Sequence, residues 1–310
     1  MEAEYCAPGW ARTSSQTLAP AGESPAAYAR SVRRRESSCR LHREWPCNHN
    51  QATLRVGGGS RVSESVISVS ELTRRFGATT ALDSVSVSLP RGAVYGLFGA
   101  NGAGKTTLIR HILGLLRAER GSVRVFGLDP VAEPVAVLSR IGYLSEENDL
   151  PGWMGVDELI RYTSAFYPKW DDAYAEELRR AFALDPAAKI KDLSRGQKAR
   201  MGLLIALAHR PELLVLDEPS SGLDPIVRRD ILGAVIRTIA DEGRTVLFSS
   251  HLLQEVEQVA DHVTMIHQGA IVLSAPLDDI RESHRIAGRV PSLDEIFVAH
   301  VGTPASAADA

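Results

Sequence analysis

From residue 66 onward, two kinds of hydrophobic pattern alternate along the chain. Short runs in which nearly every residue is apolar, such as 213–216 and 245–248, are typical of strands buried on both faces of a sheet. Segments with apolar residues at helical spacing, such as 107–113, separate these runs. We therefore predict an α/β fold in which helices cover both faces of a mainly parallel sheet.

Other patterns add smaller parts to this core. Residues 66–69 and 84–89 alternate apolar and polar positions, as half-buried strands do, and 263–266 with 270–273 indicate a hairpin. Residues 152–193 have helical spacing, which predicts an inserted helical subdomain at about 150–194. The remaining expected elements are strands at 93–98, 122–127 and 141–144 and helices at 134–138, 196–208, 226–240 and 252–260.

The two ends of the chain differ from the rest. Residues 1–65 are rich in Ala, Ser, Pro and Arg and show no persistent period, so we expect a disordered extension. A start codon assigned too far upstream is an alternative interpretation of this segment. Its Cys and His residues at 39–49 are of metal-ligand type but lack the usual zinc spacing. We expect residues 301–310 to be a flexible tail.

Composition excludes several classes of protein. The chain has 310 residues, of which 44% are hydrophobic and 24% are charged, as in ordinary globular proteins. A net charge of −3 gives no sign of a nucleic-acid surface. Apolar runs such as 203–208 are too short to span a bilayer, so membrane work would need another chain. The three cysteines all lie before residue 48 and no secretory signal is visible, which favours the cytoplasm.

The strongest chemical signal is a phosphate-binding loop between strand 93–98 and helix 107–113. Its sequence matches G-x-x-x-x-G-K-[ST], and its glycines allow a tight turn whose N–H groups face phosphate oxygens. We predict that Lys105 reaches the β- and γ-phosphates and that the Thr106 hydroxyl holds Mg²⁺. The predicted nucleotide contacts are Gly99, Ala100, Asn101, Gly102, Ala103, Gly104, Lys105, Thr106 and Thr107.

Two further stretches carry candidate site residues. Asp217 and Glu218 follow the buried run 213–216, at the strand end where open α/β sheets bind ligands. We predict that Asp217 binds Mg²⁺ and that Glu218 polarises an attacking water. The stretch 193–198 reads LSRGQK and begins a helix with Ser194 as its N-cap, and the N–H groups of such a turn bind anions.

In combination, these stretches resemble the nucleotide-binding domain of ATP-binding cassette (ABC) transporters. The motifs occur in the family's order along the chain. After the phosphate loop come 193–198 as the LSGGQ signature, 213–218 as Walker B, 220–224 as the D-loop and His251 as the switch histidine. The resemblance covers about residues 66–300. It implies a P-loop NTPase: a RecA-like core with a mainly parallel sheet, an antiparallel β-subdomain and an inserted helical subdomain.

The resemblance also implies a mechanism. ABC domains hydrolyse ATP as head-to-tail dimers, here a homodimer or a heterodimer with a related ATPase. Each ATP would lie between one subunit's phosphate loop and the signature turn of the other, contacted by Ser194, Gly196 and Gln197. His251 would contact the γ-phosphate and hold the attacking water together with Glu218. A separately encoded integral-membrane permease would use this cycle, which places the protein on the inner face of the cell membrane.

Three positions refine this resemblance. Phe76 lies where the family has an aromatic residue that stacks on adenine, with an ordinary core Phe as the alternative. Glu146 replaces the usual Q-loop glutamine and is able to bind Mg²⁺ or its water. Arg195 replaces the first signature glycine, where its charge would assist at the γ-phosphate. These replacements and the segment 291–297 are similar to the ABC-2 type exporter branch. The segment 166–171 resembles its Ytr-like group, with a helix–helix connection that packs aromatic residues as an equal alternative.

We therefore expect the ATPase subunit of a bacterial ABC exporter, with no nucleic-acid partner. One alternative is a non-transport ABC ATPase that acts on ribosomes or DNA. The chain shows one cassette and no heptad run, which does not favour that alternative. Another is a regulatory nucleotide-binding protein with little turnover, and the presence of Glu218 and His251 argues against it. The sequence does not indicate the transported substrate.

Overall fold

The computed structural model describes residues 65–147, 149–224, 226–229, 231–233, 243–285 and 289–301. The expected N-terminal extension and C-terminal tail lie outside these ranges, apart from Ser65 and Val301. The Cys and His pattern at 39–49 and part of the helix expected at 226–240 also lie outside them.

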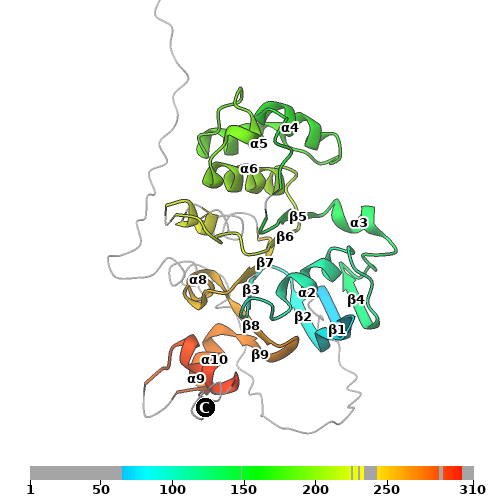
Figure 1. The fold of residues 1–310 in the computed structure, drawn as a ribbon, viewed down its shortest axis with the longest axis vertical. Coiled ribbons are helices and arrows are strands. Elements are labelled where there is room, and N and C mark those ends of the chain that lie inside the picture. The colour runs from blue at the N-terminus through cyan, green and yellow to red at the C-terminus, as the bar shows by residue number, and fades with distance from the viewer. Residues whose placement is uncertain are drawn as a thin grey trace, which may run out of the picture. The chain divides into compact units, whose positions relative to one another are not determined.

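A sheet with the strand order β5-β6-β7-β3-β8-β9 forms the centre of the fold (Figure 1). Neighbouring strands from β5 to β8 run parallel, and β9 runs antiparallel to β8. This confirms both the predicted parallel sheet and the predicted hairpin. The strands are β3 (Val94–Phe98), β5 (Ile141–Leu144), β6 (Leu213–Leu216), β7 (Thr245–Ser250), β8 (His262–His267) and β9 (Ala270–Pro276).

A smaller antiparallel sheet has the order β2-β1-β4 and consists of β1 (Ser65–Phe76), β2 (Thr79–Pro90) and β4 (Arg120–Val125). β1 and β2 are longer than predicted. The pairing of β1 shifts register between Val69 and Leu72, where Glu71 has φ 49°. This irregularity breaks the alternation of apolar and polar residues although the strand continues. β4 ends at Val125, two residues before the predicted end, because Phe126 turns the chain with φ 55°.

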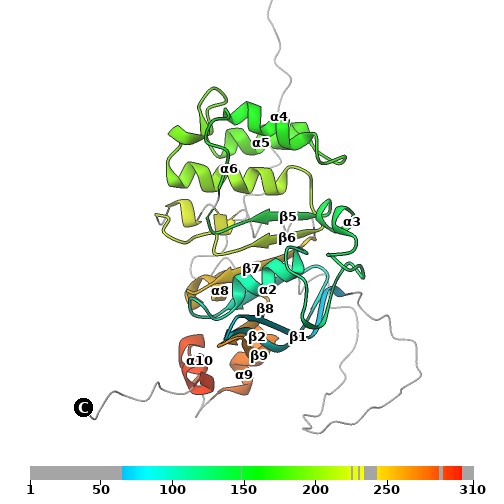
Figure 2. The same cartoon turned by 45° about the vertical axis from the view of Figure 1, so that its right-hand side comes forward.

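The expected helical block is present as α4 (Val156–Ser164), α5 (Asp172–Ala181) and the short 3₁₀ turn η1 (Ile190–Asp192). Figure 1 and Figure 2 show α4 and α5 on the side of α6 (Arg195–Leu207) that faces away from β5. Within the described residues, no helix is long and apolar enough to cross a membrane. Other helices with defined bounds are α2 (Lys105–Ile112), α3 (Pro134–Leu138), α8 (Leu253–Val259), α9 (Leu277–Ser283) and α10 (Leu293–Val301), and residues 226–229 and 231–233 are also helical.

The central sheet separates two hydrophobic cores. The sequence of β6 contains no polar residue because the strand lies between these two cores. Leu214 and Leu216 pack into the core that contains α6, while Leu213 and Val215 pack into the core that contains α2 and the smaller sheet. Successive side chains of a strand point to opposite faces, so a strand with a core on each side needs four apolar residues in a row. Because β6 is buried between the two cores, the strand ends where its apolar run ends, directly before the carboxylates of Asp217 and Glu218.

Candidate functional site

Three adjacent strands end at one edge of the sheet and carry most of the predicted site. β6, β7 and β3 are neighbours and run parallel, so their carboxyl ends lie side by side. Asp217 and Glu218 follow β6, His251 follows β7, and the phosphate loop follows β3. The sheet order therefore brings together groups that are far apart in the sequence.

The phosphate loop closes tightly on the first turn of α2. Gly104 has φ 112°, and an added Cβ would lie 2.7 Å from the carbonyl oxygen of Ala81 in β2, so only glycine fits there. Lys105 follows as the first residue of α2. Its Nζ donates hydrogen bonds to the carbonyl oxygens of Gly99, at 2.6 Å, and Ala100, at 3.2 Å. The ammonium is thus held inside the loop that the motif predicted.

The carboxylate of Glu218 lies between Lys105 and His251. Lys105 Nζ is 3.0 Å from Glu218 Oε1, and His251 Nδ1 is 2.7 Å from Glu218 Oε2. The side chains of Lys105 and Glu218 are only 5% and 4% exposed, so little water screens the pair. Glu218 has φ 47° and precedes Pro219, a conformation that few residues adopt and that occurs at functional sites. Its N–H donates to Ser249 Oγ at 2.9 Å, which secures this conformation.

Asp217 meets the hydroxyl groups of Thr106 and Ser249. Ser249 Oγ donates to Asp217 Oδ1 at 2.7 Å, and Thr106 supplies a second hydrogen bond. Burial raises the pKa of Asp217, and these two hydrogen bonds act in the opposite direction. A buried carboxylate beside a threonine hydroxyl is the kind of oxygen donor set that suits Mg²⁺, so the two residues fit the predicted ion.

Comparison with known proteins decides which class of protein this geometry belongs to. The ABC transporter family matches residues 82–221. The bacitracin transport ATP-binding protein BcrA of Bacillus licheniformis is 32% identical over 223 residues, which cover 71% of this chain and 73% of BcrA. The chain belongs to the ATP-binding proteins of ABC transporters. ATP binding and hydrolysis, which the resemblance implied, are the activity of this family.

Two more comparisons support the finer assignments. The ABC transporter ATP-binding protein YtrB of Bacillus subtilis is 28% identical over 219 residues, which cover 71% of this chain and 75% of YtrB. A solved ATP-binding subunit of an ABC transporter has a TM-score of 0.69 and 29% identity, and covers 77% of this chain and 100% of that chain. The predicted P-loop fold and the resemblance to ATP-binding proteins of ABC transporters are confirmed.

The ABC signature turn caps α6 with its own side chains. Gln197 N–H donates to Ser194 Oγ at 3.2 Å, and Ser194 N–H donates to Gln197 Oε1 at 2.9 Å. The Cβ of an alanine at Gly196 would lie 2.7 Å from a methyl group of Val227, so a side chain there would need the neighbouring helix to shift. These bonds stay within the turn and do not join it to the phosphate loop.

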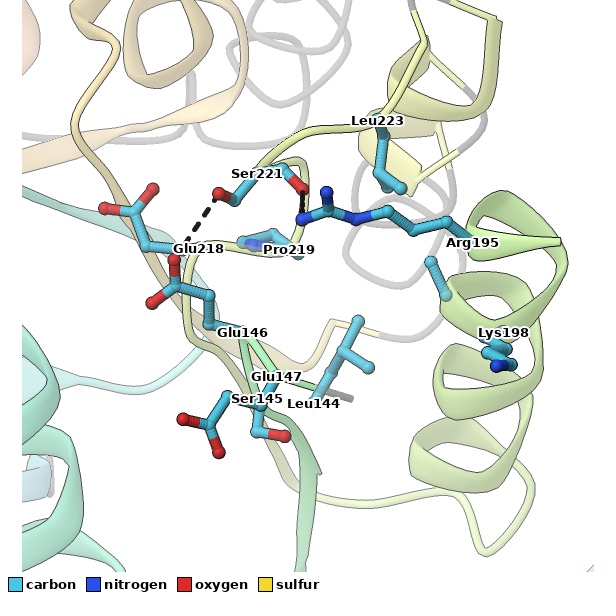
Figure 3. Close-up of a pocket in the computed structure, with 11 residues that line it drawn as sticks. Leu144, Ser145, Glu146, Glu147, Arg195, Lys198, Glu218, Pro219, Ser221 and Leu223 are labelled. Carbon is cyan, nitrogen blue, oxygen red and sulfur yellow. Dashed lines mark hydrogen bonds between the residues drawn. The ribbon is translucent and has the colours of Figure 1, made fainter. Parts of the chain in front are cut away.

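Phe76 and Glu146 lie outside the group around Glu218. Phe76 is 47% exposed at the end of β1, and the Arg74 guanidinium lies 4.7 Å from its ring centroid. The alternative of a core residue is therefore wrong, because the ring is half open to solvent. Glu146 accepts a hydrogen bond from Ser221 Oγ at 3.4 Å, as Figure 3 shows. Among the contacts of the described residues, Glu146 is thus linked to the D-loop and not to Thr106 or Asp217.

Sequence reasoning missed a buried network around Glu255. Ser220 of the D-loop donates to both Glu255 oxygens, at 2.8 and 2.7 Å, and Ser250 donates to Oε2 at 2.7 Å. Arg228 forms an ion pair with Oε1 at 3.2 Å. Glu255 is 3% exposed and lies one helical turn after His251. An acidic residue in the first turn of a helix has an ordinary explanation in the helix dipole, so it gave no signal.

Proposed function

We propose that this chain is the ATP-hydrolysing subunit of a bacterial ABC exporter and that it drives a separate permease. The observation that carries this proposal is the position of Glu218 between Lys105 and His251 at the ends of adjacent strands. Glu218 acts as the base that polarises the attacking water, because its carboxylate is fixed and nearly dehydrated. His251 holds that water and the γ-phosphate, and Lys105 binds the β- and γ-phosphates.

ATP and Mg²⁺ bind at the edge formed by the phosphate loop and Walker B in this proposal. Thr106 and Asp217 would hold the ion, and Glu146, in the loop after β5, would supply a further oxygen to the ion or its water. The N–H groups of the loop bind the phosphates, and Phe76 stacks on the base. In a head-to-tail dimer, Ser194, Gly196 and Gln197 of the second subunit complete the site. The second subunit is another copy of this chain or a related ATPase.

A group of exposed aromatic residues supports a docking site for a permease. Tyr162 and Phe166 are 54% and 62% exposed, and their rings meet edge to face. Large apolar side chains gathered on a surface mark interaction sites in soluble domains. Bound in this way, the ATPase lies on the cytoplasmic face of the membrane. The name of BcrA, a bacitracin transport protein, supports a transport role.

The decisive experiment is purification from native membranes, followed by identification of the chain that accompanies the protein. We expect an integral-membrane protein, and replacement of Tyr162 and Phe166 by serine should release it while ATP binding is kept. The matched control replaces Val135, which is 81% exposed on α3, and should leave the partner bound. Recovery with ribosomes or DNA, without a membrane protein, would contradict the proposal and support a non-transport ABC ATPase.

We further propose that residues 66–300 form the ATPase domain, with a helical subdomain at about 150–194. Removal of residues 1–60 should then leave ATP turnover within about twofold of the full chain, since deletion of a segment outside a folded domain has little effect on it. An inactive or unfolded product would mean that the N-terminal segment belongs to the domain.

A further inference from the structure

Arg195 does not extend freely from the signature turn but contacts the D-loop of its own chain. It is the first residue of α6, directly after the N-cap Ser194. Its Nη2 donates a hydrogen bond of 2.9 Å to the carbonyl oxygen of Ser221. Figure 3 shows the side chain reaching from the start of α6 across to the loop that carries Ser221. The signature turn and the D-loop are therefore joined within one subunit, by a residue that replaces a family glycine.

Gly222 has a backbone conformation that favours glycine, and its lack of a side chain leaves room for the guanidinium of Arg195. Its φ is 64°, in the left-handed region that favours glycine. An added Cβ would lie 2.5 Å from Cζ of Arg195, far inside contact distance. The guanidinium thus lies directly on the peptide backbone at Gly222. Any larger residue at this position would push the guanidinium away from Ser221.

A cavity lies beside the guanidinium and the D-loop. Arg195 lines a cavity of about 410 Å³ together with the carboxylate-bearing residues Glu146, Glu147 and Glu218. Lys198 lines the same cavity, and among the described residues Arg195 forms no ion pair with these carboxylates, so the hydrogen bond to Ser221 is its contact with the D-loop. Ser221 is also bonded on its other side, where its hydroxyl donates to Glu146 Oε1. The D-loop is thus connected both to the start of α6 and to the loop after β5.

We propose that Arg195 is a positioning residue that fixes the D-loop to the signature turn of the same subunit. The inference rests on the head-to-tail dimer of the proposed function, in which the signature turn completes the partner's ATP site. With Arg195 in place, residues 194–197 and 220–224 keep a constant spacing and meet the partner as one rigid surface. By resemblance to the family, the charge of Arg195 would assist at the γ-phosphate. In this proposal the same charge holds the D-loop instead. Without this contact the D-loop must become ordered when the dimer forms, and this ordering weakens dimerisation.

The first test measures the contact in the monomer by hydrogen–deuterium exchange. The amides of Ser221 and Leu223 donate to Glu218 and Ser220 carbonyl oxygens at 3.0 and 3.1 Å, so their exchange reports opening of the D-loop. Arg195→Ala should speed exchange of a peptide that spans the D-loop by about tenfold, the effect of losing one charge-assisted hydrogen bond. Lys198→Ala is the matched control, because Lys198 lies one turn further along α6 and lines the same cavity.

Gly222→Ala provides a second route to the same change. In the otherwise unchanged protein, it should speed exchange of the D-loop, because the methyl group displaces the guanidinium. In the Arg195→Ala background, it should add much less, since the contact is already lost. Equal effects in the two backgrounds would show that the alanine acts only through the strained backbone at Gly222, and they would contradict the proposal.

The second test measures ATP-dependent dimerisation by sedimentation, with all variants in a Glu218→Gln background. Arg195→Ala should weaken dimerisation by about tenfold, while Lys198→Ala should not, and ATP affinity below the dimerisation concentration should be unchanged for both. Unaltered exchange of the D-loop in Arg195→Ala would overturn the inference, whatever the dimer does. If Glu218→Gln itself forms no dimer with ATP, the head-to-tail mechanism fails and the exchange result alone decides the role of Arg195.

Discussion

The Nζ atom of Lys105 lies 3.0 Å from Oε1 of Glu218, and both side chains are almost completely buried. The same ammonium donates hydrogen bonds to two carbonyl oxygens of the phosphate loop, so Glu218 is its counter-ion inside the protein. A γ-phosphate that binds Lys105 must therefore compete with the carboxylate of Glu218. Binding of ATP and release of the base for its reaction are coupled through this single cation.

Replacement of Glu218 by glutamine should separate these two effects. ATP affinity should rise by about tenfold, because the phosphate no longer competes with a buried ion pair for Lys105. Turnover should fall by at least about 10²-fold, because an amide cannot accept the proton of the attacking water. Calorimetric titration with ATP and a phosphate-release assay measure the two quantities.

The control for Glu218→Gln is Glu147→Gln, which removes a negative charge from the adjacent cavity without touching Lys105. It should change neither ATP affinity nor turnover by more than about twofold, as is usual for a substitution that breaks no direct contact. Lys105→Ala should lose ATP affinity outright. Wild-type turnover in Glu218→Gln would remove Glu218 as the base.

The parts of this fold that the sequence predicts are those that a single strand or turn determines. β6 was predictable because its side chains alternate between two cores, which requires an uninterrupted apolar run before Asp217. The full length of β1 was not, because the irregular pairing around Glu71 removes the alternation on which the prediction depends. The Ser194 cap was predictable because it needs only four consecutive residues.

The rest of the candidate site depends on side chains that meet across long sequence separations. Glu255 contacts Ser220, 35 positions away, and no local pattern marks either residue as part of a network. The position of Arg195 on Ser221 likewise depends on a left-handed Gly222 in a separate loop. Motifs identify which residues react, but the contacts that hold them in place follow from tertiary packing.

Glu255 is such a positioning residue, and its replacement should affect stability and turnover differently. Glu255→Ala leaves two buried hydroxyls and the Arg228 charge without their acceptor, and should lower the free energy of unfolding by about 3 kcal/mol. Glu255→Gln keeps the shape and one acceptor. It should fold, but lower kcat by about tenfold with little change in KM, since Ser250 and the adjacent His251 lose their anchor.

Glu257→Gln on the same helix is the matched control for Glu255. Glu257 is partly exposed and forms only a long ion pair of 3.5 Å with Arg281. Its replacement should alter neither urea unfolding nor the ratio of kcat to KM. If Glu255→Gln and Glu257→Gln gave the same kinetics, Glu255 would have a purely structural role.

Glu212 predicts a dependence of stability on pH. Hydrogen bonds from Arg140, with a further contribution from Arg91, lower the pKa of Glu212 to about 2. Because this value lies below that of an unfolded glutamate, the stabilisation is complete at neutral pH and is lost as the pH falls from about 4.5 toward 2. The side chain is 37% exposed, so solvent screening limits the effect to about 1 kcal/mol.

Glu212→Gln should therefore destabilise the protein at pH 7 and make its unfolding less sensitive to acid below pH 4.5. Urea unfolding at pH 7 and pH 3.5 measures both changes. Glu177→Gln is the comparison, because Glu177 is exposed on α5 and forms no ion pair among the described residues, whereas Glu212 binds arginines that precede two other strands. A parallel loss of stability for both proteins at the two pH values would contradict the assignment to Glu212.

Phe76 tests whether the exposed ring binds the base of ATP. One face of the ring is covered by Arg74, and the side chain is 47% exposed. Stacking of a base on an aromatic ring is worth about 1–3 kcal/mol, so Phe76→Ala should weaken ATP binding by about tenfold or more, while Phe76→Trp should retain it. Inorganic tripolyphosphate has no base, and its affinity should be the same in all three proteins. Calorimetry with both ligands gives the ratio of affinities that isolates stacking.

Phe126 offers a matched control, since it too has an arginine against its ring, with the Arg140 guanidinium 3.7 Å from the centroid. Phe126→Ala removes an aromatic ring and an arginine contact from the turn that follows β4, and it should leave the ratio of ATP to tripolyphosphate affinity unchanged. If Phe76→Ala weakened both ligands equally, the ring would support the phosphate loop and not the base. If Phe76→Ala weakened the binding of neither ligand, adenine would bind elsewhere, because removal of a ring that stacks on the base must lower the affinity for ATP.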